Sequence, residues 1–391
     1  PADKPADKPA DKPADKPAAK AASKPADKPQ EESVNGEPDP AIMSTMAEED
    51  RDFALMGEYV GPMKAAGRKY RAVAIQVRPM GNGLFEAVQY FGGLPGETKP
   101  QPPITLIGKR HDDSLVLSGG PWAAFVEPTD CVLINRHGQE VGHLERVIRE
   151  SATLGAAPPK NAIVLFDGTN TEKFTNGRIT EEGLLMQGAD VKPMFQDFDL
   201  HLEFLLPYMP AGRDQGRGNS GVYLQSRYEV QVLDSFAEPP TFNGCGSLYR
   251  FREPDVNMCL PPLQWQTYDI AFTAPRWNSD GTKASNARVT VWLNGVVVQD
   301  NVELPDKTGA GQPEEPTLLP IRLQDHGNPV RFRNIWLVDR GAGPAGRFPV
   351  FVPSEEDQEP AIRPSRMKPG KRNQPKPPAA EEAEPAQSDE A

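Results

Sequence analysis

The sequence predicts an all-β fold: an antiparallel two-sheet β-sandwich over residues 160–341, preceded by a small β-rich domain over residues 46–157. Three observations lead to this prediction. Residues 198–204 alternate strictly between apolar and polar side chains, which is the period of a half-buried strand. Asn294 and Gly295 separate two apolar runs, and this pair marks a β-hairpin because both turn residues need positive φ. No segment of helical period has a convincing length.

The two ends of the chain differ from the middle. Residues 1–45 open with Pro-Ala-Asp-Lys repeated almost without change, and residues 342–391 are rich in Pro, Glu and Lys. Frequent proline blocks helix and sheet alike, and neither segment has enough apolar residues to form a core. We therefore predict a disordered arm before the folded part and a disordered tail after it.

The small domain is predicted from short apolar alternations broken by glycine and proline. It contains no recognisable catalytic constellation, and its boundary with the sandwich falls at residues 155–159. Its expected strands are Tyr70–Val77, Leu84–Tyr90, Ile104–Ile107, Ser114–Leu117, Ala123–Val126 and Cys131–Ile134.

Net charge and hydropathy exclude two classes of partner. The net charge is -12, and no basic stripe is interleaved with aromatic residues, so nucleic-acid binding is not expected. No run of about 20 apolar residues exists, so no membrane span is predicted. The chain begins at Pro1, which fits a processed N-terminus, so the lack of a visible signal segment does not argue for the cytoplasm.

The sandwich segment contains five ordered motifs: Leu165–Gly168, Gly218–Tyr223, Tyr228–Asp234, Trp265–Asp269 and Leu323–Trp336. In this order they resemble the 3-keto-disaccharide hydrolase domain family. The resemblance covers residues 160–340, under half of the chain, and implies a concanavalin-like jelly roll. The arrangement is similar to secreted proteins of planctomycete-type bacteria, so a periplasmic or secreted location and a keto-oxidised carbohydrate partner are expected.

Strand parity selects the candidate site. Along residues 228–232, the apolar side chains share one face, so Glu229 and Gln231 point the other way, toward a groove if this sheet is the concave one. Residues 321–326 alternate in the same way, which turns Gln324 and His326 away from the apolar face. Glu229 and His326 are the candidate catalytic residues. The candidate substrate-binding residues carry amide, carboxylate, aromatic or guanidinium groups: Asn219, Tyr223, Gln231, Gln324, Asp325, Arg331 and Arg333.

Each candidate also has a purely structural interpretation. Glu229 can be a solvated sheet residue, His326 can cap the turn that follows it, and Asn219 can be a turn residue. The glutamines can pair across strands, and the arginines can pair with carboxylates. These alternatives stay open at the level of sequence.

The chemistry expected from the resemblance is cleavage of a 3-keto-glycoside. The strand carries only Glu229-x-Gln231, which lacks the second carboxylate of a retaining glycosidase. A 3-ketone acidifies the proton on carbon 2, so one base and one acid, Glu229 or His326, would suffice for elimination. Arg331 or Arg333 would lie over the enolate oxygen, or a divalent cation would replace them.

Two other classes of function remain possible. The same groove without a competent acid–base pair would be a non-catalytic carbohydrate-binding module, and the repetitive arm would suit a cell-envelope scaffold. Catalysis predicts a carboxyl or imidazole of perturbed pKa, whereas mere binding predicts an exposed aromatic platform.

Cys245 and Cys259 flank one loop-like stretch. A single disulfide between them is predicted for an oxidising compartment, and two unpaired small buried residues are the alternative.

Overall fold

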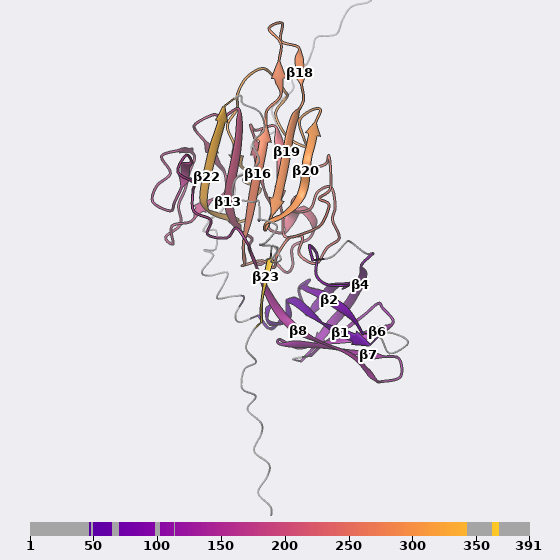
Figure 1. The fold of residues 1–391 in the computed structure, drawn as a ribbon. Helices are drawn as coiled ribbons and strands as arrows, with labels where there is room; N and C mark the ends of the chain where they lie inside the picture. The colour runs from indigo at the N-terminus through magenta and orange to yellow at the C-terminus, as the bar shows by residue number, and fades with distance from the viewer. Residues whose placement is uncertain are drawn as a thin grey trace, which may run out of the picture. The chain divides into compact units, whose positions relative to one another are not determined.

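The computed structural model describes residue 47, residues 50–64, 70–97, 102–112 and 114–341, and the backbone of residues 362–366. The described part is almost entirely antiparallel β-structure (Figure 1), which confirms the predicted fold class. Its named α-helix is α2 (Arg51–Leu55), which Asp50 caps by accepting a hydrogen bond from the backbone N–H of Asp52. Among the described residues, no helix has the length and apolar character needed to cross a membrane.

The accessory domain is a meander of eight strands that closes on itself, because β1 pairs with both β2 and β8. Its core holds the apolar residues of alternating strand positions, such as Val73, Ile75 and Val77 of β2. The sequence prediction missed β1 and β8, whose apolar periods are interrupted by Pro62 and by charged residues. The strands are β1 (Gly57–Lys64), β2 (Tyr70–Pro79), β3 (Leu84–Phe91), β4 (Ile104–His111), β5 (Ser114–Ser118), β6 (Trp122–Val126), β7 (Asp130–Asn135) and β8 (Glu140–Ser151).

The sandwich has a small sheet of order β10-β12-β21-β14-β15 and a large sheet of order β11-β22-β13-β16-β19-β20, with β9 also paired to β22. The small-sheet strands are β10 (Phe174–Thr175), β12 (Ala189–Val191), β14 (Ser220–Leu224), β15 (Tyr228–Val232) and β21 (Arg322–Leu323). The large-sheet strands are β9 (Ile163–Phe166), β11 (Leu185–Met186), β13 (Asp197–Leu205), β16 (Trp265–Thr273), β19 (Ala287–Leu293), β20 (Val296–Leu304) and β22 (Arg331–Gly341). A separate ribbon joins β17 (Arg276–Trp277) to β18 (Lys283–Ser285).

The sandwich core forms where the apolar faces of the two sheets meet. The alternating apolar residues of β13 lie in one buried cluster with those of β14, β15 and β21, as the strict alternation predicted. The predicted hairpin joins β19 to β20, with φ of 55° at Asn294 and 82° at Gly295. The core residues from these four strands are Phe198, Leu200, Leu202, Phe204, Val222, Leu224, Tyr228, Val230, Val232 and Leu323.

One segment of the C-terminal tail contradicts the predicted disorder. Ile362–Arg366 forms β23, which pairs antiparallel with β8 from Val147 to Ser151. The pairing of β1 with β8 ends at Val147, so the rest of β8 offers unpaired backbone groups that another strand can take up. The remaining residues of both ends predicted to be disordered lie outside the described residues.

Candidate functional site

The candidate site is centred on Glu229, on the outer face of the small sheet. Tyr228 and Val230 point into the core, so Glu229 points away from it, as strand parity predicted. Glu229 lies opposite Tyr223 in the antiparallel register of β14 and β15. The Tyr223 hydroxyl donates a hydrogen bond of 2.7 Å to Glu229 Oε2.

The Glu229 side chain is buried although it faces outward: the residue is only 2% exposed. The backbone N–H of Glu229 donates to Thr308 Oγ1 at 2.7 Å, and its carbonyl accepts from the N–H of Tyr249 at 3.1 Å. A Cβ on Gly221 would lie 2.5 Å from Glu229 Oε1, so this glycine provides the space in which the carboxyl lies. Segments distant in sequence therefore enclose the carboxyl.

Burial changes the acidity of this carboxyl. It raises the pKa of Glu229 from 4.5 to about 7, although the hydrogen bond from Tyr223 lowers the value in part. Burial also raises the pKa of Tyr223, so its hydroxyl stays protonated as a donor. A carboxyl that titrates near neutral pH can both accept and donate a proton, as general acid–base catalysis requires.

Amide side chains surround Glu229. The side-chain amide of Gln231 makes the most hydrogen bonds when its nitrogen faces Glu229 Oε1 at 3.2 Å. The amide oxygen of Gln231 then lies 2.9 Å from the side-chain amide of Gln215. Asn219 Nδ2 donates to the carbonyl of Gln215 at 2.7 Å. Gln324 Nε2 donates to the Tyr223 hydroxyl at 3.3 Å. The predicted residues Asn219, Tyr223, Glu229, Gln231 and Gln324 thus form one hydrogen-bonded group.

Two residues beside this group escaped the sequence prediction. Leu248 forms a bridge with Val230, so Ser247 and Tyr249 flank Gln231 and Glu229 on the outer face. They lie in the long connection from β15 to β16, where no alternation signals a strand. Buried polar atoms with unused hydrogen-bonding capacity, within the described part, include Ser247 Oγ and Gln324 Oε1. Such atoms suit a ligand rich in hydroxyl groups.

His326 and Asp325 lie on an exposed turn at the edge of this group. Strand β21 ends at Leu323, so strand parity does not extend to His326. Asp325 Oδ1 accepts from the N–H of Gly327 at 2.9 Å, so Asp325 makes the capping hydrogen bond of the turn, which the structural interpretation of the sequence assigns to His326. The Asn219 N–H donates to Asn328 Oδ1 at 2.8 Å, which attaches the turn to the site.

Arg331 and Arg333, one of which was expected over the enolate oxygen, do not lie on the sheet that carries Glu229. Both lie on β22 of the large sheet, because the chain crosses between sheets at the turn before it. Arg331 Nη1 donates to Gln187 Oε1 at 2.8 Å. Arg333 pairs with Glu203 at 2.7 Å, and its guanidinium stacks 3.9 Å from the ring centre of Trp265.

A second charged cluster lies on the outer face of the large sheet. His201 Nδ1 lies 2.5 Å from Asp269 Oδ1, and Glu203 Oε1 accepts from the N–H of Gly155 at 2.6 Å. Burial alone would lower the pKa of His201, but its hydrogen bonds to Asp269 and Glu203 raise it to about 9. All three side chains are buried, and the segment between the domains covers them, so we assign them a structural role.

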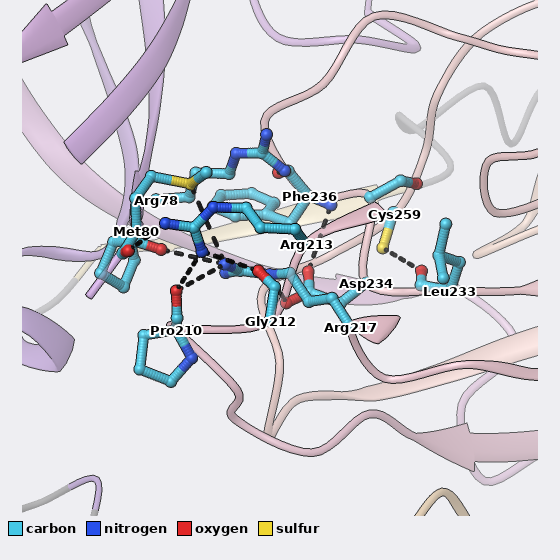
Figure 2. Close-up of polar contacts among 12 residues, drawn as sticks. Arg78, Met80, Pro210, Gly212, Arg213, Arg217, Leu233, Asp234, Phe236 and Cys259 are labelled. Carbon is cyan, nitrogen blue, oxygen red and sulfur yellow. Dashed lines mark hydrogen bonds and ion pairs between the residues drawn. The ribbon is translucent and has the colours of Figure 1, made fainter. Parts of the chain in front are cut away.

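Neither a disulfide nor a metal cluster is formed in the part of the chain that the structure describes. Contrary to the prediction, Cys245 and Cys259 are free buried thiols. Each sulfur makes hydrogen bonds as a thiol: Cys245 to the Tyr268 hydroxyl at 3.3 Å, and Cys259 to the carbonyl of Leu233 at 3.5 Å (Figure 2). No group of three or more His, Cys, Asp or Glu residues among those described could hold a metal ion.

The fold and the site together define a class: an antiparallel β-sandwich protein with a buried carboxyl of raised pKa and an amide cluster on its smaller sheet. The sequence model of the 3-keto-alpha-glucoside-1,2-lyase-like domain matches residues 161–338. The chain belongs to this family through its sandwich domain. Family membership supports a glycoside-acting, hydrolase-like role.

Two solved structures are similar to this chain. A "putative glycosyl hydrolase" from Parabacteroides distasonis is 36% identical, covering 46% of this chain and 84% of that chain, with a TM-score of 0.43. Another from the same organism is 17% identical, covering 46% of this chain and 94% of that chain, with a TM-score of 0.35. Because both TM-scores are below 0.5, the family assignment depends on sequence, not on superposition. No curated protein sequence matches the chain.

Proposed function

We propose that this protein cleaves 3-keto-glucosides by elimination across carbons 1 and 2, with Glu229 as the base. The observation that carries the proposal is the pKa of about 7 of a carboxyl that is buried among hydroxyl and amide groups. At neutral pH about half of such carboxyls are ionised, so both the base and its conjugate acid are present.

The reaction proceeds in two bond-breaking steps. The C2–H bond breaks first: its proton passes to the Glu229 carboxylate, and its electron pair forms an enolate with the oxygen on carbon 3. The enolate then restores the carbonyl, makes a C1–C2 double bond and expels the glycosidic oxygen, which takes a proton. Water adds across the new double bond afterwards, so the net result is hydrolysis.

The neighbouring side chains have separate roles in this scheme. Tyr223 donates to Glu229 and keeps its pKa from rising further, which preserves a fraction of carboxylate. Gln231, Gln324 and Ser247 bind hydroxyl groups of the sugar, since hydroxyls need partners that both donate and accept. His326 supplies the proton to the leaving oxygen from the turn that Asn219 holds beside the site.

A second candidate function is carbohydrate binding without cleavage. It is favoured by Phe242 and Phe251, which are 52% and 44% exposed, as an aromatic platform for a sugar would be. The N–H of Arg250 donates to the carbonyl of Phe242 at 2.8 Å, so Phe242 lies beside the turn after Tyr249 that carries Phe251. For either function we propose a periplasmic or secreted location.

The test is turnover of a 3-keto-disaccharide compared with its unoxidised parent. The wild type should cleave only the keto form, because the carbon-2 proton of the parent is far too weakly acidic. Glu229→Gln keeps the shape of the side chain and should lower kcat by about 10² to 10⁴. His326→Ala should lower kcat to a smaller extent, because water can replace an exposed acid.

The control is Glu303→Gln, which alters an exposed glutamate on β20 and should leave turnover unchanged. Near-normal turnover in Glu229→Gln would show that the base is another group. If the wild type binds the keto sugar without cleaving it, the protein is a non-catalytic carbohydrate-binding module and not an enzyme of this reaction.

A further inference from the structure

The connection between β13 and β14 carries two of the amides of the Glu229 site. It includes a short 3-10 turn at Asp214–Gly216, followed by Asn219. The Gln215 carbonyl accepts from Asn219 Nδ2, and its side-chain amide lies 2.9 Å from that of Gln231. The position of this connection therefore decides where the amides stand relative to Glu229.

Two arginines attach this connection to the accessory domain (Figure 2). Arg217 Nη1 donates to the carbonyl of Pro79, the last residue of β2, at 3.0 Å. Arg213 Nη2 donates to the carbonyl of Met80, which begins the turn to β3. Both arginines also donate to the carbonyl of Pro210 within the connection, at 3.3 Å for Arg217 and 3.0 Å for Arg213. Each guanidinium thus joins the connection to the Pro79–Gly83 turn.

The same turn is held from its other side. Asp52 on helix α2 accepts from the N–H of Gly83 at 3.0 Å. Asp50, which caps that helix, accepts from the Tyr208 hydroxyl at 3.0 Å, and Phe53 meets the Tyr208 ring edge-on at 4.9 Å between centroids. A helix, a turn and the connection therefore form one packed unit.

Buried charge makes this attachment rigid. Arg217 is 2% exposed, and its Nε pairs with Asp234 Oδ2 at 2.6 Å directly after β15. From the accessory domain, Arg78 donates to Glu238 and to the carbonyl of Phe236 in the same segment. A buried ion pair of this kind has few alternative arrangements, because each charge needs its partner. The chain leaving the Glu229 strand is therefore fixed to the accessory domain as well.

We propose that the Pro79–Gly83 turn of the accessory domain is a positioning element of the Glu229 site. Through Arg213 and Arg217 it fixes Gln215 and Asn219, and so sets the affinity for the sugar. The kinetic consequence rests on the function proposed above. The structural consequence, that the turn orders residues 212–219, does not depend on it.

The test is Arg213→Met, which removes the hydrogen bonds to Met80 and Pro210. Arg213 is exposed, so the variant should fold, whereas changing Arg217 would leave Asp234 buried without its partner. We expect KM for a 3-keto-disaccharide to rise about twofold to thirtyfold, with kcat unchanged, because the amides bind the sugar but do not react. Arg213→Lys should restore part of the affinity, since it keeps a cationic donor. A lower kcat at unchanged KM would indicate only a smaller folded fraction and would overturn the proposal.

Amide hydrogen exchange gives a readout that does not require activity. In Arg213→Met, the N–H groups of Gly216, Arg217 and Asn219 should exchange faster than in the wild type. The control Arg288→Met, which breaks an exposed ion pair with Glu303, should leave their exchange unchanged.

The two readouts separate the two proposals. Unchanged exchange together with unchanged KM in Arg213→Met would refute the positioning role. If exchange responds but the wild type cleaves no keto sugar, the proposed function fails while the ordering of the connection by the accessory domain stands.

Discussion

Keeping Glu229 away from water should destabilise the fold at neutral and alkaline pH. The pKa of this carboxyl rises from 4.5 in the unfolded chain to about 7 in the folded protein. Between these two pH values, the folded state holds a proton that the unfolded state has released. Stability therefore decreases as pH rises through this window, by about 1.4 kcal/mol per pH unit.

The full effect follows from the width of the window. A difference of 2.5 pH units between the two pKa values corresponds to about 3 kcal/mol. Below pH 4.5 both states are protonated and the penalty is absent, whereas above pH 7 it is complete. Glu229→Gln removes the titrating group and keeps a polar side chain that can still pair with Tyr223. The variant should therefore be more stable than the wild type by up to about 3 kcal/mol at pH 8, and nearly equal to it at pH 4.5.

Urea unfolding at pH 4.5, 6 and 8, followed by tryptophan fluorescence, measures this difference. Fluorescence reports mainly on the sandwich, because all tryptophans except Trp122 lie in it. Glu303→Gln is the matched control, since Glu303 stays in contact with water and its variant should show no such gain at pH 8. If Glu229→Gln were equally stable or less stable than the wild type at pH 8, the carboxyl would not be held at a raised pKa and the argument for its acid–base role would fail.

Three further outcomes are expected. Tyr223→Phe removes the hydroxyl that donates to Glu229, so the pKa of Glu229 should rise by about one to two units and the acidic limb of the pH–rate profile should move up with it; an unmoved limb would mean that Glu229 does not control the rate. Arg333→Lys should cost about 0.5–2 kcal/mol of stability, because lysine loses the stacking on Trp265 and the ion-pair geometry with Glu203. Turnover should be unchanged, since Arg333 lies on the other sheet from Glu229. A large loss of turnover on the keto sugar would show that Arg333 belongs to the active site. Cys245 and Cys259 should resist thiol reagents in the folded protein and react after unfolding, because both are buried; an intact mass two hydrogens lighter without reductant would reveal a bridge.

Strand parity predicted the centre of the site from sequence because it depends only on local geometry. Once Tyr228 and Val230 face the core, Glu229 must face outward, and the antiparallel register then places Tyr223 beside it. The same reasoning placed Gln231, and also Gln324, which lies one residue beyond the end of β21. The strand at residues 198–204 and the Asn294–Gly295 hairpin were predicted on equally local grounds and are confirmed, although the strand is buried on both faces and not half-buried.

Parity failed where the regular strand ended or the chain changed sheets. The alternation that assigned His326 an outward direction stops at Leu323, and the turn that follows obeys the capping chemistry of Asp325 instead. Arg331 and Arg333 lie only a few residues further on, yet they belong to the other sheet. Nothing in the sequence pattern marks this crossing, because both sheets use the same period of two.

The feature that distinguishes Glu229 from a solvated sheet residue was beyond local prediction. Its raised pKa requires burial, and burial comes from Thr308 and Tyr249, which reach β15 from connections with no strand pattern of their own. Strand parity alone would have left this carboxyl in water, where its pKa would stay near 4.5 and it would be a weak base at neutral pH. The covering segments, rather than the sheet, therefore turn an ordinary outward glutamate into a group that can exchange protons near pH 7. The difference in unfolding free energy between Glu229→Gln and the wild type measures how much those segments contribute to the raised pKa.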